Sequence, residues 1–364
     1  MSVLPTTNDS IITLSLPHGE GNPRNSEGSF VTLADGRIMF VYTHYYGHSW
    51  ADEATAYLAA RYSSDGGETW TTQDRIIIEN EGDQNVMSTS LLRLQDGRIA
   101  LFYLRKNSDY DCQPYLRMSM DEGETWSEPT LCSPIKGYYC LLNDQAVQLS
   151  AGRIMLPVSS HWITKEKNAG SSIVYFLSDD AGQSWRQARD TWIPQVRGAS
   201  RVAEPGIVER RDGSLYCYAR TGLGRQWEST SPDGGESWSA PRRSRFRCAQ
   251  APMNIKRIPA TGDLLAVWND LTPRWGVPKK KMIHGWAGDS SWGRTPLVTA
   301  ISRDDGHSWR HAQAIEDDPY RGFCYPAIHC TEDAVLLAYC SGGPDSGVLQ
   351  DLCIRRITFE QLYR

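Results

Sequence analysis

The sequence predicts an all-β protein, a six-bladed β-propeller built from four-stranded antiparallel blades. The pattern Ser-x-Asp-x-Gly-x-(Ser/Thr)-Trp, called the box below, occurs five times, starting at Ser63, Ser119, Ser178, Ser231 and Ser302. A strand–turn–strand unit occurs six times, with turns at Gly36, Gly97, Gly152, Gly213, Gly262 and Asp333 and a mean spacing of 59.4 residues. Self-similarity at such a long period is typical of propellers and other repeat folds.

Each repeat is expected to contain four strands, A to D. In the first repeat, strands A and B flank Gly36 within residues 29–43, strand C covers residues 56–63, and strand D follows the box at residues 75–79. Glycine accepts the positive φ that a tight hairpin turn requires. The sixth repeat has no box. Its last strand is expected within residues 352–362, and a strand at residues 10–16 is expected to close the ring.

Six repeats of this size account for about 356 of the 364 residues, so residues 1–364 are expected to form a single domain. The box is interpreted as structural, because its Asp and Ser side chains can bond the turn backbone while its Trp packs between strands.

The composition gives no extended charged surface for a ligand, so a ligand is expected to bind at a local site. The net charge of −5 gives no basic surface for nucleic acid and no polybasic membrane patch. No run approaches the length of a membrane span, and the N-terminal residues lack the features of a secretion signal, so a cytoplasmic location is predicted. The nine cysteines show no paired spacing and are expected to be reduced. No metal-ligand or phosphate-binding pattern is present, so no cofactor is expected.

The repeat also predicts which edge of the blades carries the chemistry. The A–B turn and the box share one edge, while the start of strand A, the end of strand B and the B–C loop share the other, called the mouth below. Six polar residues fall at the mouth: Arg24, Asp52, Glu204, Arg220, Arg294 and Tyr325. Three guanidinium groups repel one another unless an anion joins them, and a carboxylate accepts their paired bonds well.

Three stretches carry a resemblance to a known family. Residues 203–220 (AEPGIVERRDGSLYCYAR), 294–309 (RTPLVTAISRDDGHSW) and 323–339 (FCYPAIHCTEDAVLLAY), together with the five boxes, resemble the sialidase (neuraminidase) family of Asp-box, or BNR-repeat, propellers. The resemblance covers the whole chain. It implies a retaining exo-glycosidase that releases terminal α-linked sialic acid, or a related nonulosonic acid, from glycoconjugates.

The resemblance also assigns roles. It implies that Tyr325 is the nucleophile, Glu204 the base that activates it and Asp52 the acid/base, with Arg24, Arg220 and Arg294 holding the carboxylate of the sugar. A neutral tyrosine suits an anomeric carbon that bears a carboxylate, because an anionic nucleophile would be repelled by about 4 kcal/mol at 4 Å. Glu53 is an immediate rival to Asp52.

Arg24 departs from the family pattern for the first arginine, since it lies in the sequence NPRNSEG. The same stretch contains Glu27, an additional carboxylate near the mouth. Further candidates for sugar binding are Arg105, with its neighbour Lys106, and also Asp144 and His161. The long loop 270–293 holds Trp275, Lys279, Lys280, Lys281, Trp286 and Trp292, a mixture suited to a lid or to a solvated loop.

Three other functions stay open at this point. A protein-interaction scaffold is one, although it would not need the arginines gathered at the mouth. A propeller that binds an acidic sugar without turnover would keep the arginines but would need neither a nucleophile nor a base. A glycosidase for a different carboxylated sugar would keep all six mouth residues. Hydrolysis and transglycosylation are not separated by the sequence, and neither is the oligomeric state.

Overall fold

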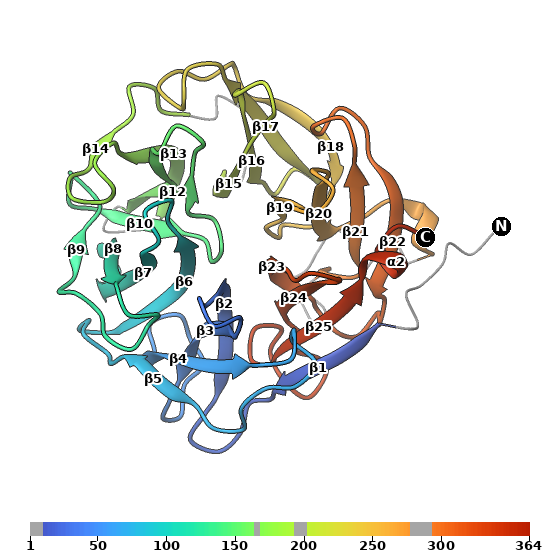
Figure 1. Ribbon diagram of the computed structural model, residues 1–364, viewed down its shortest axis with the longest axis horizontal. Helices are drawn as coiled ribbons and strands as arrows, with labels where there is room; N and C mark the ends of the chain where they lie inside the picture. Colours follow the sequence, from blue (N-terminus) through green and yellow to red (C-terminus); the bar gives the residue numbers. More distant parts are fainter. Residues whose placement is uncertain (1–9, 164–167, 193–201, 277–292) are drawn as a thin grey trace.

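The computed structural model describes residues 10–163, 168–192, 202–276 and 293–364 and shows antiparallel sheets arranged around a ring (Figure 1). Four of the sheets have four strands each. Their inner strands lie toward the centre of the ring and their outer strands form its rim (Figure 1). The prediction of an all-β fold with four-stranded antiparallel blades is confirmed for these sheets.

The four-stranded sheets follow the chain in order. They contain β2 (Arg24–Thr32), β3 (Ile38–Tyr45), β4 (Ala56–Ser63) and β5 (Arg75–Ile78); β15 (Ala203–Glu209), β16 (Leu215–Arg220), β17 (Arg225–Ser231) and β18 (Arg242–Arg247); β19 (Asn254–Arg257), β20 (Leu264–Asn269), β21 (Leu297–Ser302) and β22 (Arg310–Glu316); and β23 (Cys324–Cys330), β24 (Ala334–Cys340), β25 (Leu352–Thr358) and β1 (Ile11–Leu16). The N-terminal strand β1 pairs with β25, as predicted, and so joins the two ends of the chain in one sheet.

The second and third repeats form one sheet of nine strands. It contains β6 (Asn85–Arg93), β7 (Ile99–Ser108), β8 (Asp111–Ser119), β9 (Thr130–Leu131), β10 (Tyr138–Leu141), β11 (Val147–Gln148), β12 (Ile154–Ile163), β13 (Asn168–Ser178) and β14 (Arg186–Gln187). Strands β10 and β11 are two segments that pair with the same strand, β12. A single parallel pair, Tyr138 with Cys112, connects β10 to β8 and merges the two repeats.

The boxes close strand ends through side-chain bonds to the backbone, as predicted. In the first box, the Ser63 hydroxyl accepts from Gly67 N at 2.9 Å, and Asp65 Oδ1 accepts from Thr69 N at 2.9 Å. The same bonds recur in the other four boxes. Hydrogen bonds to the carboxylate form lower the pKa of Asp121, Asp180 and Asp304 to about 2.

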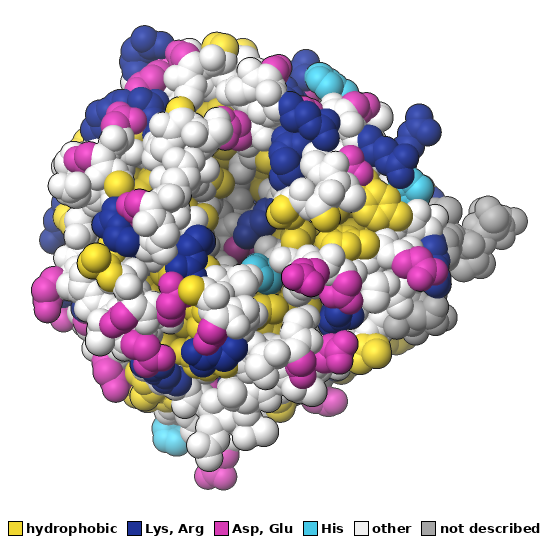
Figure 2. Space-filling view, in the orientation of Figure 1, with side chains coloured by type: hydrophobic (Ala, Val, Ile, Leu, Met, Phe, Trp, Pro, Cys, Tyr) yellow, Lys and Arg dark blue, Asp and Glu magenta, His cyan; other side chains and the backbone are white. Residues whose placement is uncertain are grey.

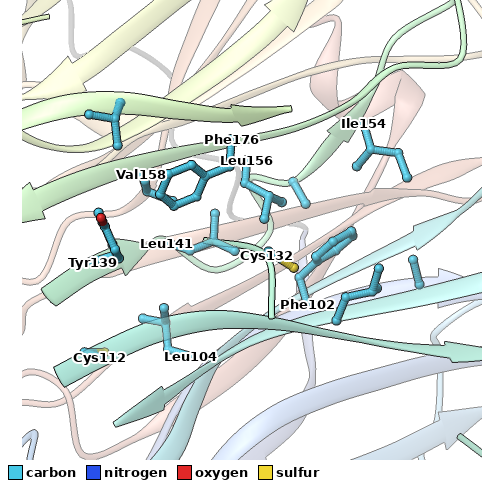
Figure 3. Close-up of a cluster of buried hydrophobic side chains, with 14 of the residues drawn as sticks. Phe102, Leu104, Cys112, Cys132, Tyr139, Leu141, Ile154, Leu156, Val158 and Phe176 are labelled. Carbon is cyan, nitrogen blue, oxygen red and sulfur yellow. The ribbon is translucent and has the colours of Figure 1, made fainter. Parts of the chain in front are cut away.

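The hydrophobic core is divided into clusters that lie between neighbouring repeats. One cluster joins β7 and β8 to β10, β12 and β13 through Phe102, Leu156 and Phe176 (Figure 3). The five box tryptophans each pack against a different one of these clusters. Burial of such large rings holds one repeat against the next, because apolar area removed from water is the main favourable term in packing.

The end of the last repeat differs from the prediction. The strand expected within residues 352–362 ends at Thr358, and Phe359–Leu362 form a short helix, α2, with Thr358 as its N-cap in a capping box. Phe359 and Tyr363 pack against the cluster between the fifth and sixth repeats. These two rings thus take the place of the tryptophan that a sixth box would supply.

One face of the ring is hollowed at its centre, and basic and acidic side chains are interspersed around it (Figure 2). Among the helices in the described ranges, none is long and apolar enough to cross a membrane. All nine cysteines are free thiols.

Candidate active site

A cavity of about 80 Å³ lies at the start of the inner strands. Three predicted mouth residues, Asp52, Glu204 and Tyr325, line it together with Glu27 and Ser88. The remaining lining residues are mostly apolar: Met87, Leu104, Cys112, Tyr138, Cys140, Leu141 and Leu142. The cavity therefore combines a carboxylate-rich rim with an apolar wall.

Four of these lining residues share an unusual backbone conformation. Glu27, Ser88, Glu204 and Tyr325 have φ between 50° and 60°, in the left-handed region that non-glycine residues rarely adopt. Each lies at a shift of register between its inner strand and the next strand. Such a bulge changes the direction of one side chain, and here it turns all four into the cavity. Strained residues of this kind cluster at functional sites.

The predicted nucleophile and base are in contact. Tyr325 Oη donates to Glu204 Oε1 at 3.0 Å, and Arg220 Nη1 donates to Glu204 Oε2 at 2.6 Å. Arg220 Nη1 also lies 3.5 Å from Tyr325 Oη. Burial raises the pKa of Tyr325 well above its usual value, with Glu204 adding to the shift while Arg220 and Arg294 oppose it. The phenol is therefore neutral and needs a base before it can attack.

Arg294 lies beside the same tyrosine. Its guanidinium is 5.5 Å from the centre of the Tyr325 ring, and Nη1 donates to Cys324 Sγ at 3.0 Å. Burial raises the pKa of the Cys324 thiol, but a bond from Cys340 and the charge of Arg294 lower it to about 7. The backbone around Arg294 is fixed by Asn269, whose amide donates to the carbonyls of Arg294 and Phe323, both at 2.9 Å.

Arg24 connects the two carboxylates on the other side of the cavity. Its Nη1 donates to Asp52 Oδ1 at 2.6 Å, and its Nη2 donates to Glu27 Oε1 at 3.3 Å. The guanidinium is only 1% exposed and stacks on the Tyr45 ring at 4.6 Å. Burial raises the pKa of Glu27 to about 7 against the effect of Arg24, and the charges of Asp52 and Glu204 add to the rise.

Asp52 differs from Glu27 in both exposure and pKa. Its side chain is 63% exposed, and although partial burial raises its pKa, Arg24 holds the pKa below the usual range. Glu53 is exposed and does not line the cavity. The structure thus places Asp52, rather than its rival, in the site.

Of the further candidates on β7, Lys106 rather than Arg105 faces the site. Strand residues alternate between faces, and the Lys106 ammonium lies 3.4 Å from the Asp52 carbonyl and 5.7 Å from the Tyr138 ring. Arg105 lies instead over Tyr115. His161 is close to the site without lining it, since its ring packs edge-on against Tyr138 and bonds to Ser159 at 3.2 Å.

The structure places Asp144 near the ring centre and away from the cavity. Its carboxylate, 2% exposed, accepts from Ser29, Asn254 and Lys256 side chains and from Ile328 N at 2.5 to 2.9 Å. These partners come from three inner strands, β2, β19 and β23. The predicted sugar-binding role is therefore corrected to a structural one, because no oxygen of this carboxylate is left for a ligand.

Trp275, in the long loop, is also structural, since it packs against the cluster between β16 and β20 and its indole donates to Asp270 at 2.8 Å. Lys279, Lys280, Lys281, Trp286 and Trp292 lie outside the described residues. Within the part of the chain that the structure describes, no group of three or more His, Cys, Asp or Glu could hold a metal ion.

A larger cavity, of about 400 Å³, lies between β1 and the sheet of β3 and β4. Its central carboxylate, Asp74, is already bonded to Tyr42, His44 and Arg61 at 2.5 to 3.0 Å. These bonds hold neighbouring strands together, so we interpret Asp74 as structural. The larger volume of this cavity does not by itself make it the active site.

The sequence and the fold are similar to those of known proteins. Residues 59–337 match the family model of the BNR repeat-like domain. The chain is 27% identical over 286 residues to the anhydrosialidase of Macrobdella decora, covering 72% of this chain and 34% of that protein. It is 26% identical over 239 residues to a sialidase of Paraclostridium sordellii, covering 56% and 57%. The chain thus spans about a third and somewhat over half of the lengths of these relatives.

Among solved structures, the intramolecular trans-sialidase of Ruminococcus gnavus has a TM-score of 0.70 at 17% identity, with 98% of each chain covered. This likeness shows a shared propeller fold over the whole ring. The family model spans most of the chain and includes all five boxes in full and the catalytic candidates Glu204 and Tyr325. The protein therefore belongs to the family of BNR repeat-like domains and has sialidases among its relatives.

Proposed function

We propose that this protein is a retaining exo-glycosidase that cleaves terminal α-linked sialic acid, or a related nonulosonic acid, from glycoconjugates. We further propose that residues 1–364 form one domain of six blades, with the nine-stranded sheet counted as two blades joined by β10. The single observation that carries the catalytic proposal is the 3.0 Å contact between Tyr325 Oη and Glu204 Oε1. A binding protein needs no such pair, since a buried phenol bonded to a carboxylate is arranged for proton transfer.

The arginines explain why the nucleophile is a tyrosine. Arg24, Arg220 and Arg294 come from three different repeats, contact residues that line the cavity, and remain charged at all accessible pH values. A sugar carboxylate held by these groups lies next to the anomeric carbon. Neutral Tyr325 approaches this carbon without charge repulsion and becomes anionic only as Glu204 takes its proton.

Two displacement steps complete the reaction. In the first, Tyr325 Oη bonds to the anomeric carbon, its proton passes to Glu204, and the bond to the leaving oxygen breaks as that oxygen takes a proton from Asp52. In the second, Asp52 accepts a proton from water, whose oxygen bonds to the anomeric carbon, and Tyr325 leaves and recovers its proton from Glu204. Two inversions give net retention.

The pairing of Asp52 with Arg24 fits this sequence of events. Without substrate, Arg24 keeps Asp52 ionised. A substrate carboxylate competes for the same guanidinium and brings a negative charge close to Asp52. Both effects raise the proton affinity of Asp52 from its lowered value, so its acid form becomes accessible for the proton transfer of the first step without becoming the main form of the complex at alkaline pH.

The proposal is tested with an aryl α-sialoside that releases a fluorophore. Tyr325→Phe removes only the phenol oxygen, and we expect kcat to fall at least 100-fold. Tyr110→Phe, at a tyrosine that is exposed and does not line the cavity, serves as the control and should retain full turnover. Undiminished turnover by Tyr325→Phe would disprove the nucleophile assignment. Binding of free sialic acid without turnover by the wild type would favour a sugar-binding propeller, and turnover of another carboxylated sugar alone would redefine the substrate.

A second product is favoured by the relatives. One relative is named an anhydrosialidase and one structural neighbour an intramolecular trans-sialidase. In such a reaction, a hydroxyl group of the same sugar would replace water in the second step and Asp52 would accept its proton. Proton NMR of the product distinguishes the two reactions, because hydrolysis gives the free sugar and intramolecular transfer gives an anhydro sugar.

A further inference from the structure

Glu27 is the one carboxylate at the cavity whose position neither acid/base nor nucleophilic chemistry explains. It lies at the bulge of β2 with φ 57° and is 5% exposed. Its Oε1 receives a bond of 3.3 Å from Arg24. Its Oε2 is buried and has no hydrogen-bond partner among the described residues. An oxygen buried in this way is unfavourable unless a ligand or a proton completes its bonding.

The surroundings of Glu27 disfavour its ionised form. Arg24 gives its shorter bond, 2.6 Å, to Asp52 and only the longer one to Glu27. The titratable or charged groups that act on Glu27, or on which it acts, are Arg24, Tyr45, Asp52, Cys112, Glu204, Cys324 and Tyr325. Burial is the main cause that raises its pKa, to about 7, against the effect of Arg24, and the charges of Asp52 and Glu204 add to the rise. Near neutral pH, Glu27 therefore exchanges between its protonated and its ionised form.

A bound carboxylate changes this balance. Because Nη2 of Arg24 contacts Glu27 and Nη1 contacts Asp52, any carboxylate that reaches this guanidinium from the cavity approaches Glu27 as well. Two carboxylates in contact cannot both stay ionised, and the more buried one takes the proton. The protonated carboxyl then becomes a hydrogen-bond donor toward the ligand.

We propose that Glu27 is a proton-carrying binding residue whose Oε2, in the protonated carboxyl, donates a hydrogen bond to the substrate carboxylate held by Arg24. Binding of the acidic sugar then takes up one proton from solvent. This inference rests on the proposed function. It adds a role in recognition. Because Glu27 must carry a proton when the substrate carboxylate binds beside it, the affinity for the acidic sugar depends on pH.

Titration calorimetry of the full-length protein with a dehydrated sialic acid analogue tests this inference. Titrations at pH 8 in buffers of different ionisation enthalpy report the number of protons taken up. We expect close to one proton per ligand for the wild type, and an affinity that falls by up to tenfold per pH unit above pH 7. Glu27→Gln keeps a donor of the same shape, so it should bind with an affinity that is nearly independent of pH between 7 and 9 and take up close to no proton.

Two further variants separate Glu27 from its neighbours. Asp52→Asn and Cys324→Ser each remove another group that could gain a proton, and both should retain the uptake. Loss of uptake in either variant, or no uptake by the wild type at pH 8, overturns the inference while leaving the glycosidase proposal intact. A tenfold or greater loss of affinity in folded Glu27→Gln at pH 6 also overturns it, because an ionised carboxylate would then be required. If Glu27→Gln does not fold, the uptake by the wild type and by Asp52→Asn decides. If the wild type does not bind the analogue, both proposals fail.

Discussion

At the scale of single residues, the site is built from strained backbone. Glu27, Glu204 and Tyr325 each occupy the left-handed region, at a cost of about 1–3 kcal/mol per residue. The ladder pairs on both sides of each bulge hold this conformation in place. The strain positions three reactive oxygens around one small cavity before any ligand binds. Preorganisation of this kind lowers the cost of assembling the reacting groups.

The roles of Asp52 and Glu53 can be separated by matched substitutions. Asp52→Asn removes the acid/base, so we expect turnover of an alkyl sialoside to fall by about 10²- to 10⁴-fold. The fall should be much smaller for an aryl sialoside, whose leaving group needs less protonation. Glu53→Gln should stay within twofold of the wild type for both substrates. The reverse ranking of the two variants, measured as kcat/KM, would transfer the role to Glu53.

At the scale of elements, the boxes act as connections between repeats. Each box tryptophan packs on the cluster that its own repeat shares with the preceding or following one, and Trp238 stacks on Tyr175 at 4.4 Å between centroids. The sixth repeat lacks this tryptophan, and α2 brings Phe359 and Tyr363 to the matching cluster. The boxes therefore stabilise the ring at the edge opposite the chemistry.

Removal of one box tryptophan should weaken the fold without changing the site. Trp238→Ala deletes the ring that stacks on Tyr175, and we expect the free energy of unfolding to fall by about 3 kcal/mol. Met120→Ala, at a side chain that is 86% exposed, is the control and should change it by less than about 0.5 kcal/mol. Urea titration followed by fluorescence measures both. A large change in KM of the folded Trp238→Ala protein would contradict a purely structural role.

At the scale of the whole molecule, two features hold the ring together. The pairing of β1 with β25 joins the start of the chain to its last repeat. Asp144 adds a connection at the centre, where one carboxylate bonds to β2, β19 and β23. Both features are long-range, so they form only when distant parts of the chain meet.

Substitution of Asp144 tests this central connection. Asp144→Asn leaves Lys256 without its carboxylate and one donor without an acceptor, so we expect a loss of about 2 kcal/mol in unfolding free energy. KM should stay within twofold of the wild type, because the side chain does not line the cavity. Thermal melting reports the loss of stability, and steady-state kinetics report KM. A raised KM with unchanged melting would restore the sugar-binding role that the sequence predicted.

Several features of the site were predictable because the repeat gives the distance of each residue from a turn. Arg24 begins β2 and Arg220 ends β16, as their spacing from Gly36 and Gly213 indicated. Arg105 and Lys106 could not be separated from the sequence, because neighbouring strand residues face opposite sides and a spacing rule has no such resolution. The contacts of Asp144 were not predictable for a related reason, since it lies between β10 and β11 and a spacing rule does not show which distant strands its carboxylate meets. A residue followed by Gly or Pro, as in Glu27-Gly28, Glu204-Pro205 and Tyr325-Pro326, was the available signal for the bulges.

The sequence by itself determined the all-β class, the strand order within each repeat and the edge that carries the polar residues. These are local properties, since alternation, turn residues and the boxes act over fewer than about 60 residues. Only the tertiary structure decided which oxygens lie within bonding distance, that Asp144 is a structural centre, and that Glu27 is buried with one oxygen unbonded. Those properties depend on the closure of the ring, which brings side chains from its first and last repeats into the same low-dielectric cavity.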